Sequence, residues 1–132
     1  MVEIGTQNIR GCKPSSRYQK FFDKNNLLYF EGSLPSTRVL TAPLLKIPTS
    51  QKEAAEKKTW IDAGWYGLTG VDEHGDQCII LDRGMTIFHS ILAKQTVLHE
   101  MIHIYLGTGT HGKNFKIQIR RIAALGALDR LI

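Results

Sequence analysis

Apolar residues recur at the spacing of an α-helix in three stretches of the chain. The first covers residues 18–29, follows a pair of serines that can cap a helix, and is followed by a glycine and a proline that end it. The second covers residues 87–106 and stops before Gly107, in a position typical of helix C-termini. The third starts near His111 and carries an apolar stripe at Phe115, Ile119, Ile122 and Leu125. The pattern predicts one helix near the N-terminus and two in succession at the C-terminal end.

Three shorter segments between these helices have the composition of β-strands. Residues 37–42 form the first, and an aromatic, glycine-containing stretch at 60–68 forms the second. The clearest strand is 77–82, and turn-forming residues at 72–76 join it to the second strand as an antiparallel hairpin. The predicted fold class is therefore α+β, with an N-terminal helix, a small antiparallel sheet, a helix at 87–106 and a C-terminal helix.

A chain of 132 residues has the size of one domain. Residues 1–14 show little periodicity, and we expect a flexible lead-in there, followed by the domain proper at 15–132. Residues 43–58 are expected to be a surface insertion, because prolines bracket a short apolar piece and polar helix formers follow it.

The composition is that of a soluble globular protein, with 42% hydrophobic and 22% charged residues. No apolar run approaches the length of about 18 residues that a membrane-spanning helix needs. The N-terminus also lacks the basic and then apolar segments of an export signal. We therefore expect a cytoplasmic protein without a membrane partner, and we favour a monomer.

Two cysteines are too few to predict a disulfide framework. We expect Cys12 and Cys78 to be reduced thiols, with a bridge between them as the alternative. The formal net charge of +5 is compatible with a nucleic acid or another anionic partner.

The candidate chemistry lies in the run His99-Glu100-Met101-Ile102-His103. Residues four apart share one face of a helix, so His99 and His103 can bind one zinc ion, at about 2.0–2.1 Å each. Glu100 lies beside them and can take a proton from a zinc-bound water as that water attacks a carbonyl. The spacing therefore predicts a zinc-dependent hydrolase with Glu100 as the catalytic base. The alternative is a helix with two solvent-facing histidines.

A catalytic zinc site usually has three protein ligands and one water. No glutamate follows Glu100 in the chain, so the downstream candidates for the third ligand are His111 and Asp129. We favour His111, because two glycines precede it in a short loop that can reverse the chain, whereas Asp129 lies where chain ends fray. The remaining histidines, His74 and His89, lack ligand spacing.

These two histidine motifs, His99 to His103 and then His111-Gly112-Lys113-Asn114-Phe115, make the chain resemble the SprT-like (Spartan-type) metallopeptidase domain. Upstream, Phe30 to Pro35 is similar to a segment that follows the first helix in that family, and the resemblance covers about residues 17–125. It implies a zincin-like minimal metallopeptidase with one Zn²⁺ per chain held by His99, His103 and His111. It also implies protein or peptide substrates, which in known members include DNA-associated proteins.

Such peptidases commonly bind substrate as an added strand at a sheet edge, which makes Cys78, Ile79 and Ile80 the candidate edge. A plain structural strand is the alternative. Tyr66 and Tyr105 are candidates to stabilise the oxyanion, although Tyr105 shares the apolar face of its helix and fits the core better.

Lys113, Lys116 and Arg120 form a basic stripe on the last helix, with Arg121 adjacent. Aromatic residues that could stack on unpaired bases are Trp60, Trp65 and Tyr66. These features make single-stranded or junction DNA a candidate partner, whereas a solvated helix face and core aromatics are the alternative.

Two other functions compete with proteolysis. One is a non-catalytic, zinc-containing nucleic-acid-binding module, which would need a fourth protein ligand. The other is a zinc hydrolase for a different amide, such as a cell-wall peptide, and the absence of an export signal at the N-terminus disfavours it.

Overall fold

The computed structural model of the chain describes residues 2–3, 6, 11–43, 67–109 and 111–131. The predicted insertion at 43–58 lies outside these residues except for Pro43, and the predicted strand at 60–68 is described only from Gly67. The aromatic residues proposed to stack on bases also lie outside them: Trp60, Trp65 and Tyr66.

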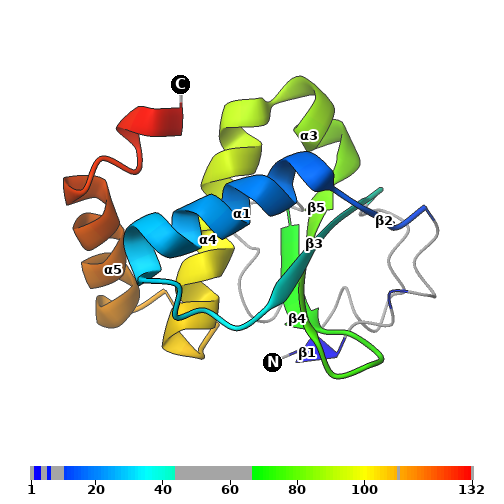
Figure 1. The fold of residues 1–132 in the computed structure, drawn as a ribbon, viewed down its shortest axis with the longest axis horizontal. Helices are drawn as coiled ribbons and strands as arrows, with labels where there is room; N and C mark the ends of the chain where they lie inside the picture. Colours follow the sequence, from blue (N-terminus) through cyan, green and yellow to red (C-terminus); the bar gives the residue numbers. More distant parts are fainter. Residues whose placement is uncertain (1, 4–5, 7–10, 44–66, 110, 132) are drawn as a thin grey trace.

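A mixed five-stranded sheet has the order β1-β4-β5-β3-β2 (Figure 1). Its strands are β1 (Val2–Glu3), β2 (Lys13–Pro14), β3 (Thr37–Ala42), β4 (Gly67–Val71) and β5 (Gln77–Asp82). The two outer strands belong to the segment that we expected to be a lead-in, and both pair with the sheet.

The predicted antiparallel pairing is confirmed, because β4 and β5 pair antiparallel with Gly67 opposite Leu81. The first strand of this hairpin runs to Val71, three residues beyond its predicted end at residue 68. The prediction of a purely antiparallel sheet is wrong, because β3 runs parallel to β5 and β1 runs parallel to β4. The alternation of apolar and polar residues records only which face a side chain takes, so it carries no information on strand direction.

The first predicted helix is α1 (Ser16–Phe30). Ser15 caps its N-terminus by accepting a hydrogen bond from the backbone N–H of Tyr18 at 3.3 Å. At its C-terminal end Glu31 and Gly32 take left-handed conformations, with φ of 55° and 71°, and the Gly32 N–H donates to the Asn26 carbonyl.

The helix predicted at 87–106 is two helices, α3 (Arg83–Phe88) and α4 (Ser90–Leu106). The Asp82 side chain caps α3 by accepting from the Met85 N–H, and His89 breaks the helical path with φ −137° and ψ 66°. No proline or glycine marks this break, so the periodicity alone did not reveal it. The chain continues with α5 (Lys113–Ala124) and a short 3₁₀ helix, η3 (Asp129–Leu131).

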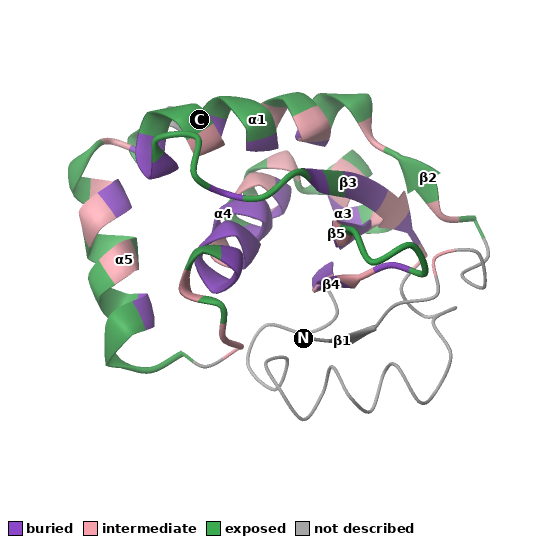
Figure 2. Ribbon diagram, turned by 60° about the horizontal axis from the view of Figure 1, so that its bottom comes forward, coloured by how far each residue is buried: buried purple, intermediate pink, exposed green. Residues whose placement is uncertain are grey.

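The core lies between the sheet and two helices, α4 packing on β4 and β5, and α1 packing on β3 and α4. Buried residues line the inner sides of these elements, whereas the outer sides of α1 and α5 are largely exposed (Figure 2). α5 packs on α4 away from the sheet (Figure 1). Among the described helices, none combines the length and apolar character that crossing a bilayer requires.

Both cysteines are free thiols in the structure. Cys78 is fully buried in β5, and this burial, followed by the nearby charge of Asp72, raises the pKa of its thiol to about 12.

Candidate metal centre

Helix α4 carries both motif histidines and Glu100, four residues or fewer apart, near its C-terminal end. It ends at Gly107, whose φ of 68° is in the left-handed region and whose N–H donates to the His103 and Ile104 carbonyls. A residue with a β-carbon would be strained in that conformation, so glycine lets the chain turn within four residues of His103.

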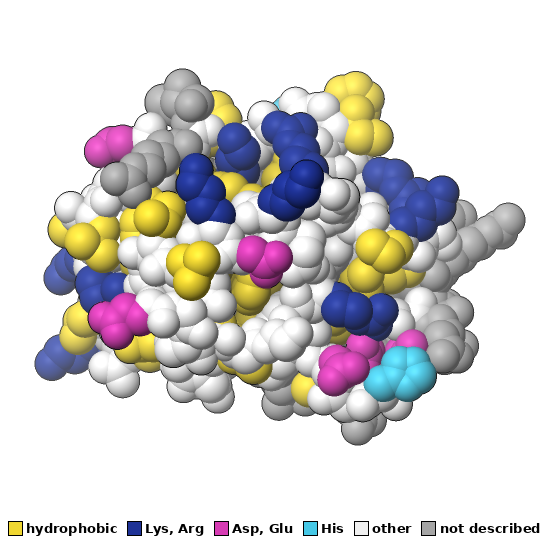
Figure 3. All heavy atoms as spheres, viewed as in Figure 1, with side chains coloured by type: hydrophobic (Ala, Val, Ile, Leu, Met, Phe, Trp, Pro, Cys, Tyr) yellow, Lys and Arg dark blue, Asp and Glu magenta, His cyan; other side chains and the backbone are white. Residues whose placement is uncertain are grey.

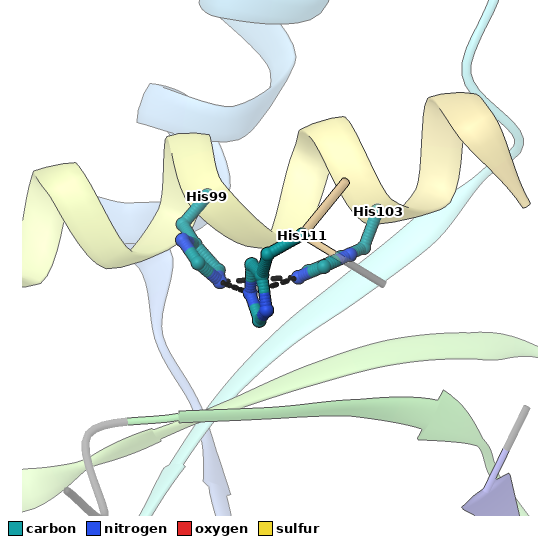
Figure 4. A group of neighbouring side chains, drawn as sticks. All are labelled: His99, His103 and His111. Carbon is teal, nitrogen blue, oxygen red and sulfur yellow. Dashed lines mark hydrogen bonds between the residues drawn. The ribbon is translucent and has the colours of Figure 1, made fainter. Parts of the chain in front are cut away.

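The turn brings His111 back to the two histidines of α4, and the three rings converge on one point (Figure 4). Nε2 of His103 lies 3.1 Å from Nε2 of His99 and 3.1 Å from Nε2 of His111, and the third side of this triangle measures 2.9 Å. Three nitrogens bound tetrahedrally to one zinc at about 2.0–2.1 Å would lie about 3.3 Å apart. The spacing is therefore compatible with zinc.

A backbone contact sets the tautomer of His103. Its Nδ1 lies 2.8 Å from the Thr108 carbonyl oxygen, which can only accept, so Nδ1 carries the proton. The neutral ring then has its lone pair on Nε2, directed toward the other two histidines. This arrangement, in which a carbonyl orients a ligand histidine from behind, is common in metal sites.

The pKa values favour neutral histidines that can donate lone pairs. Burial, followed by the charges of His103 and His111, lowers the pKa of His99 to about 3. Burial also lowers the pKa of His103, and the hydrogen bond to Thr108 opposes this effect only in part. Since metal ligands must be deprotonated, the centre would not need to release protons from these two rings at neutral pH.

Phe115 supports all three ligands from one side. Its ring centroid lies 4.9 Å from that of His99, 4.8 Å from that of His103 and 4.9 Å from that of His111. Phe115 lies in the first turn of α5, and His111 lies in the loop just before that helix, so the start of α5 places the third histidine and its packing partner together. The sequence places Phe115 in the apolar stripe of the last helix and in the second histidine motif, but it does not predict this packing against the three rings.

Glu100 faces the sheet and is 3% exposed. Its Oε2 accepts a hydrogen bond from Oγ1 of Thr69 in β4 at 2.5 Å, and its buried Oε1 has no partner among the described residues. Burial raises the pKa of Glu100 to about 7, while the Thr69 hydrogen bond lowers it. A carboxylate that titrates near neutral pH can both take and return a proton there.

Asp129, the other candidate for the third ligand, is exposed in η3 and does not join the histidine cluster. His74 and His89 also lie outside the cluster within the described part of the chain, as predicted. His111 is the exposed member of the three, and His103 is the buried one, so the centre is open to solvent on the His111 side.

The candidate substrate strand is a correction. Cys78, Ile79 and Ile80 are fully buried in β5, which pairs with β4 on one side and β3 on the other. A substrate needs an unpaired edge, so these residues cannot accept an added strand. The sequence suggests this strand only by analogy with peptidases that bind substrate at a sheet edge, whereas a continuous apolar run such as 78–81 is typical of a strand buried in the middle of a sheet.

The other predicted residues divide by exposure. Lys113, Lys116 and Arg120 are exposed on α5, as a binding surface requires. Arg121 is not part of that surface, because its guanidinium donates to the Tyr29 carbonyl and stacks on the rings of Phe30 and Tyr105.

Tyr105 is 45% exposed and packs on Phe30 with ring centroids 5.3 Å apart. It is therefore neither a core residue nor a neighbour of the three histidines by any described ring contact. Tyr66, the other candidate for the oxyanion, lies outside the described residues.

Comparison with known proteins gave one match. The model of the SprT-like family matches residues 18–129, which include all but the first two residues of α1, the strands from β3 to β5, and the three histidines. No curated protein and no solved structure matches the chain.

Proposed function

The chain belongs to the SprT-like family, and on that premise we propose that it is a zinc-dependent metalloendopeptidase. One zinc ion per chain would be held by His99, His103 and His111, and the substrate would be a protein or peptide. The observation that carries the proposal is the position of Glu100, a buried carboxylate beside three convergent imidazoles, with Oε1 lacking a partner in the described part of the chain.

A zinc ion bound there would polarise the scissile carbonyl and lower the pKa of its bound water. Glu100 would accept a proton from the attacking water on Oε1, and the electron pair left on the water oxygen would form the bond to the carbonyl carbon. Glu100 would then return the proton to the amide nitrogen as the carbon–nitrogen bond breaks. In the metal-free chain burial raises the pKa of Glu100 to about 7, and a buried carboxylate with a raised pKa is a stronger base than an exposed one.

The alternative of a purely structural zinc module receives less support. Structural zinc sites are closed by four protein ligands, whereas in the described residues only three metal-binding side chains come together. An open fourth position and a buried carboxylate beside it are features of hydrolytic sites.

We also propose that α5 contacts single-stranded or junction DNA, or proteins bound to it. Lys113, Lys116 and Arg120 are exposed at spacings of three and four residues, so they share one face of the helix. The row begins two residues after His111, which would place a bound phosphate backbone next to the metal centre. Phosphate contacts of this kind are independent of base sequence.

The decisive experiment is a cleavage assay on wild type and Glu100→Gln with an unstructured protein substrate such as casein. The amide keeps the shape of the side chain but cannot take a proton, so we expect one zinc per chain and at least an approximately 100-fold loss in kcat. Glu31→Gln, the same change at an exposed position, is the matched control and should cleave like wild type.

Cleavage by Glu100→Gln at the wild-type rate would remove Glu100 as the base. A wild-type chain that is purified without zinc and fails to bind added zinc would contradict the metal centre itself.

A further inference from the structure

The hydrogen bond between Thr69 and Glu100 joins a strand to the helix that carries the metal-binding motif. Building on the proposed function, we propose that Thr69 is a positioning residue, which fixes the Glu100 carboxylate so that Oε1 is the oxygen that takes the proton. The contact is local to the site, yet Thr69 lies 31 residues before Glu100 in the chain.

The direction of this hydrogen bond follows from the ionised form of Glu100, in which the residue acts as a base. An ionised carboxylate only accepts, so the Thr69 hydroxyl donates its single proton to Oε2 at 2.5 Å. Glu100 is 3% exposed, and Oε1 has no partner among the described residues. One oxygen is thus held by the protein, and the other is left to meet the reacting water.

The position of Thr69 follows from how β4 packs on α4. Residues two apart in a strand point to the same face, so Gly67 and Thr69 both face the helix. Opposite them are Thr96 and Glu100, which are four apart and share a face of α4. Two residues along a strand span about 6.8 Å, and four residues along a helix span about 6.0 Å. Because these distances are similar, Gly67 lies opposite Thr96 and Thr69 lies opposite Glu100.

Gly67 sets the distance between these elements. A β-carbon on Gly67 would lie 3.0 Å from Cγ2 of Thr96 and 3.3 Å from the carbonyl oxygen of Ile80. The strand and helix therefore approach more closely than a larger residue would allow. This close approach lets a side chain as short as threonine reach the Glu100 carboxylate.

A hydrogen bond from Thr69 to a buried carboxylate also stabilises the fold. The test must therefore separate a loss of stability from a loss of catalysis. Thr69→Val removes the hydroxyl and keeps the shape, and Thr69→Ser keeps the hydroxyl. Thr96→Val is the matched control, because it removes another threonine hydroxyl from the same interface, one that donates to the Leu92 carbonyl and not to Glu100.

We expect Thr69→Val to lower kcat about 10- to 100-fold with KM within about twofold of wild type, as for other residues that orient a catalytic group. Zinc content and melting temperature should match those of Thr96→Val, and Thr69→Ser should recover kcat to within about threefold of wild type. Thr69→Ala supplies the same comparison if the valine variant does not fold.

Wild-type kcat in Thr69→Val would overturn the proposal, as would an equal loss in Thr69→Ser or in Thr96→Val. The failure of the proposed function is distinguishable, because it would leave Glu100→Gln as active as wild type, or leave wild type itself without zinc and without cleavage. If Glu100 is the base and Thr69 positions it, Thr69→Val should cause no further loss in kcat when added to Glu100→Gln.

Discussion

At the scale of single residues, the three histidines are held in different ways. His103 is buried and oriented by the Thr108 carbonyl, whereas His111 is exposed and comes from the loop before α5. Phe115 packs against all three rings and limits how far each can turn. Helix α4 already fixes His99 and His103, so holding these two side chains in place for an ion costs little conformational entropy.

His103→Ala should reduce bound zinc from one per chain to near zero. The change removes a ligand and also leaves the Thr108 carbonyl without the imidazole N–H that it binds. Metal analysis after dialysis measures the outcome, with His74→Ala, an exposed histidine in the β4–β5 turn, as the control. Full zinc occupancy in His103→Ala would exclude His103 as a ligand.

At the scale of elements, α1 and α5 both present basic residues to solvent. Figure 3 shows Lys and Arg side chains gathered over α1, whose exposed cations include Arg17, Lys20 and Lys24 at the same spacing as the stripe on α5. The two helices differ in location, because of these two only α5 begins beside His111 of the histidine cluster. The basic residues of α1 are therefore a control for those of α5. They test whether nucleic-acid binding depends on where the charges lie or only on the net charge.

Replacing Lys113, Lys116 and Arg120 with glutamine should weaken binding to a single-stranded oligonucleotide. If all three contact phosphates, the slope of log K against log salt should fall in magnitude by about 2. Replacing Arg17, Lys20 and Lys24 changes the charge equally and should leave that slope nearly unchanged. Fluorescence anisotropy at several salt concentrations makes the comparison, and equal effects of the two triple variants would show that only net charge matters.

At the scale of the whole molecule, the buried ionisable groups of the metal centre couple its protonation to folding. In the metal-free protein the pKa of His99 is about 3, against 6.5 for the model imidazole. The unfolded chain then binds a proton that the folded chain excludes, so stability falls as pH drops from about 6.5 toward 3. Glu100 acts in the opposite direction, because its pKa is raised from 4.5 to about 7.

For Glu100 the folded chain binds the proton between pH 4.5 and 7, so its contribution to stability is present below 4.5 and is lost as pH rises to 7. We expect the melting temperature of metal-free Glu100→Gln, relative to wild type, to increase across this range and then level off. Thermal scans in a chelator between pH 4 and 8 measure this difference. Glu31→Gln controls for loss of one charge, and a pH-independent difference for Glu100→Gln would contradict the burial argument.

Much of this architecture could be predicted because it depends on neighbours in the chain. Helix periodicity located α1, α4 and α5, and turn residues located the β4–β5 hairpin. The helix break at His89 could not be predicted, because the apolar spacing continues through that residue. The central position of β5 in the sheet could not be predicted either, because apolar spacing is similar in central and edge strands. The sequence places Arg121 next to the basic stripe but does not show that its side chain contacts Tyr29 and Phe30.

The sequence by itself determined the His99–His103 pair and the adjacent Glu100, since spacing along one helix places them together whatever surrounds that helix. It also narrowed the third ligand to His111 or Asp129, and the tertiary structure brought His111 to the pair. Only the tertiary structure decided which groups hold this centre in place: Thr69, Thr108 and Phe115. Thr69 reaches Glu100 across 31 residues because β4 packs closely on α4 at Gly67, and the spacing of residues along a chain does not encode such a contact.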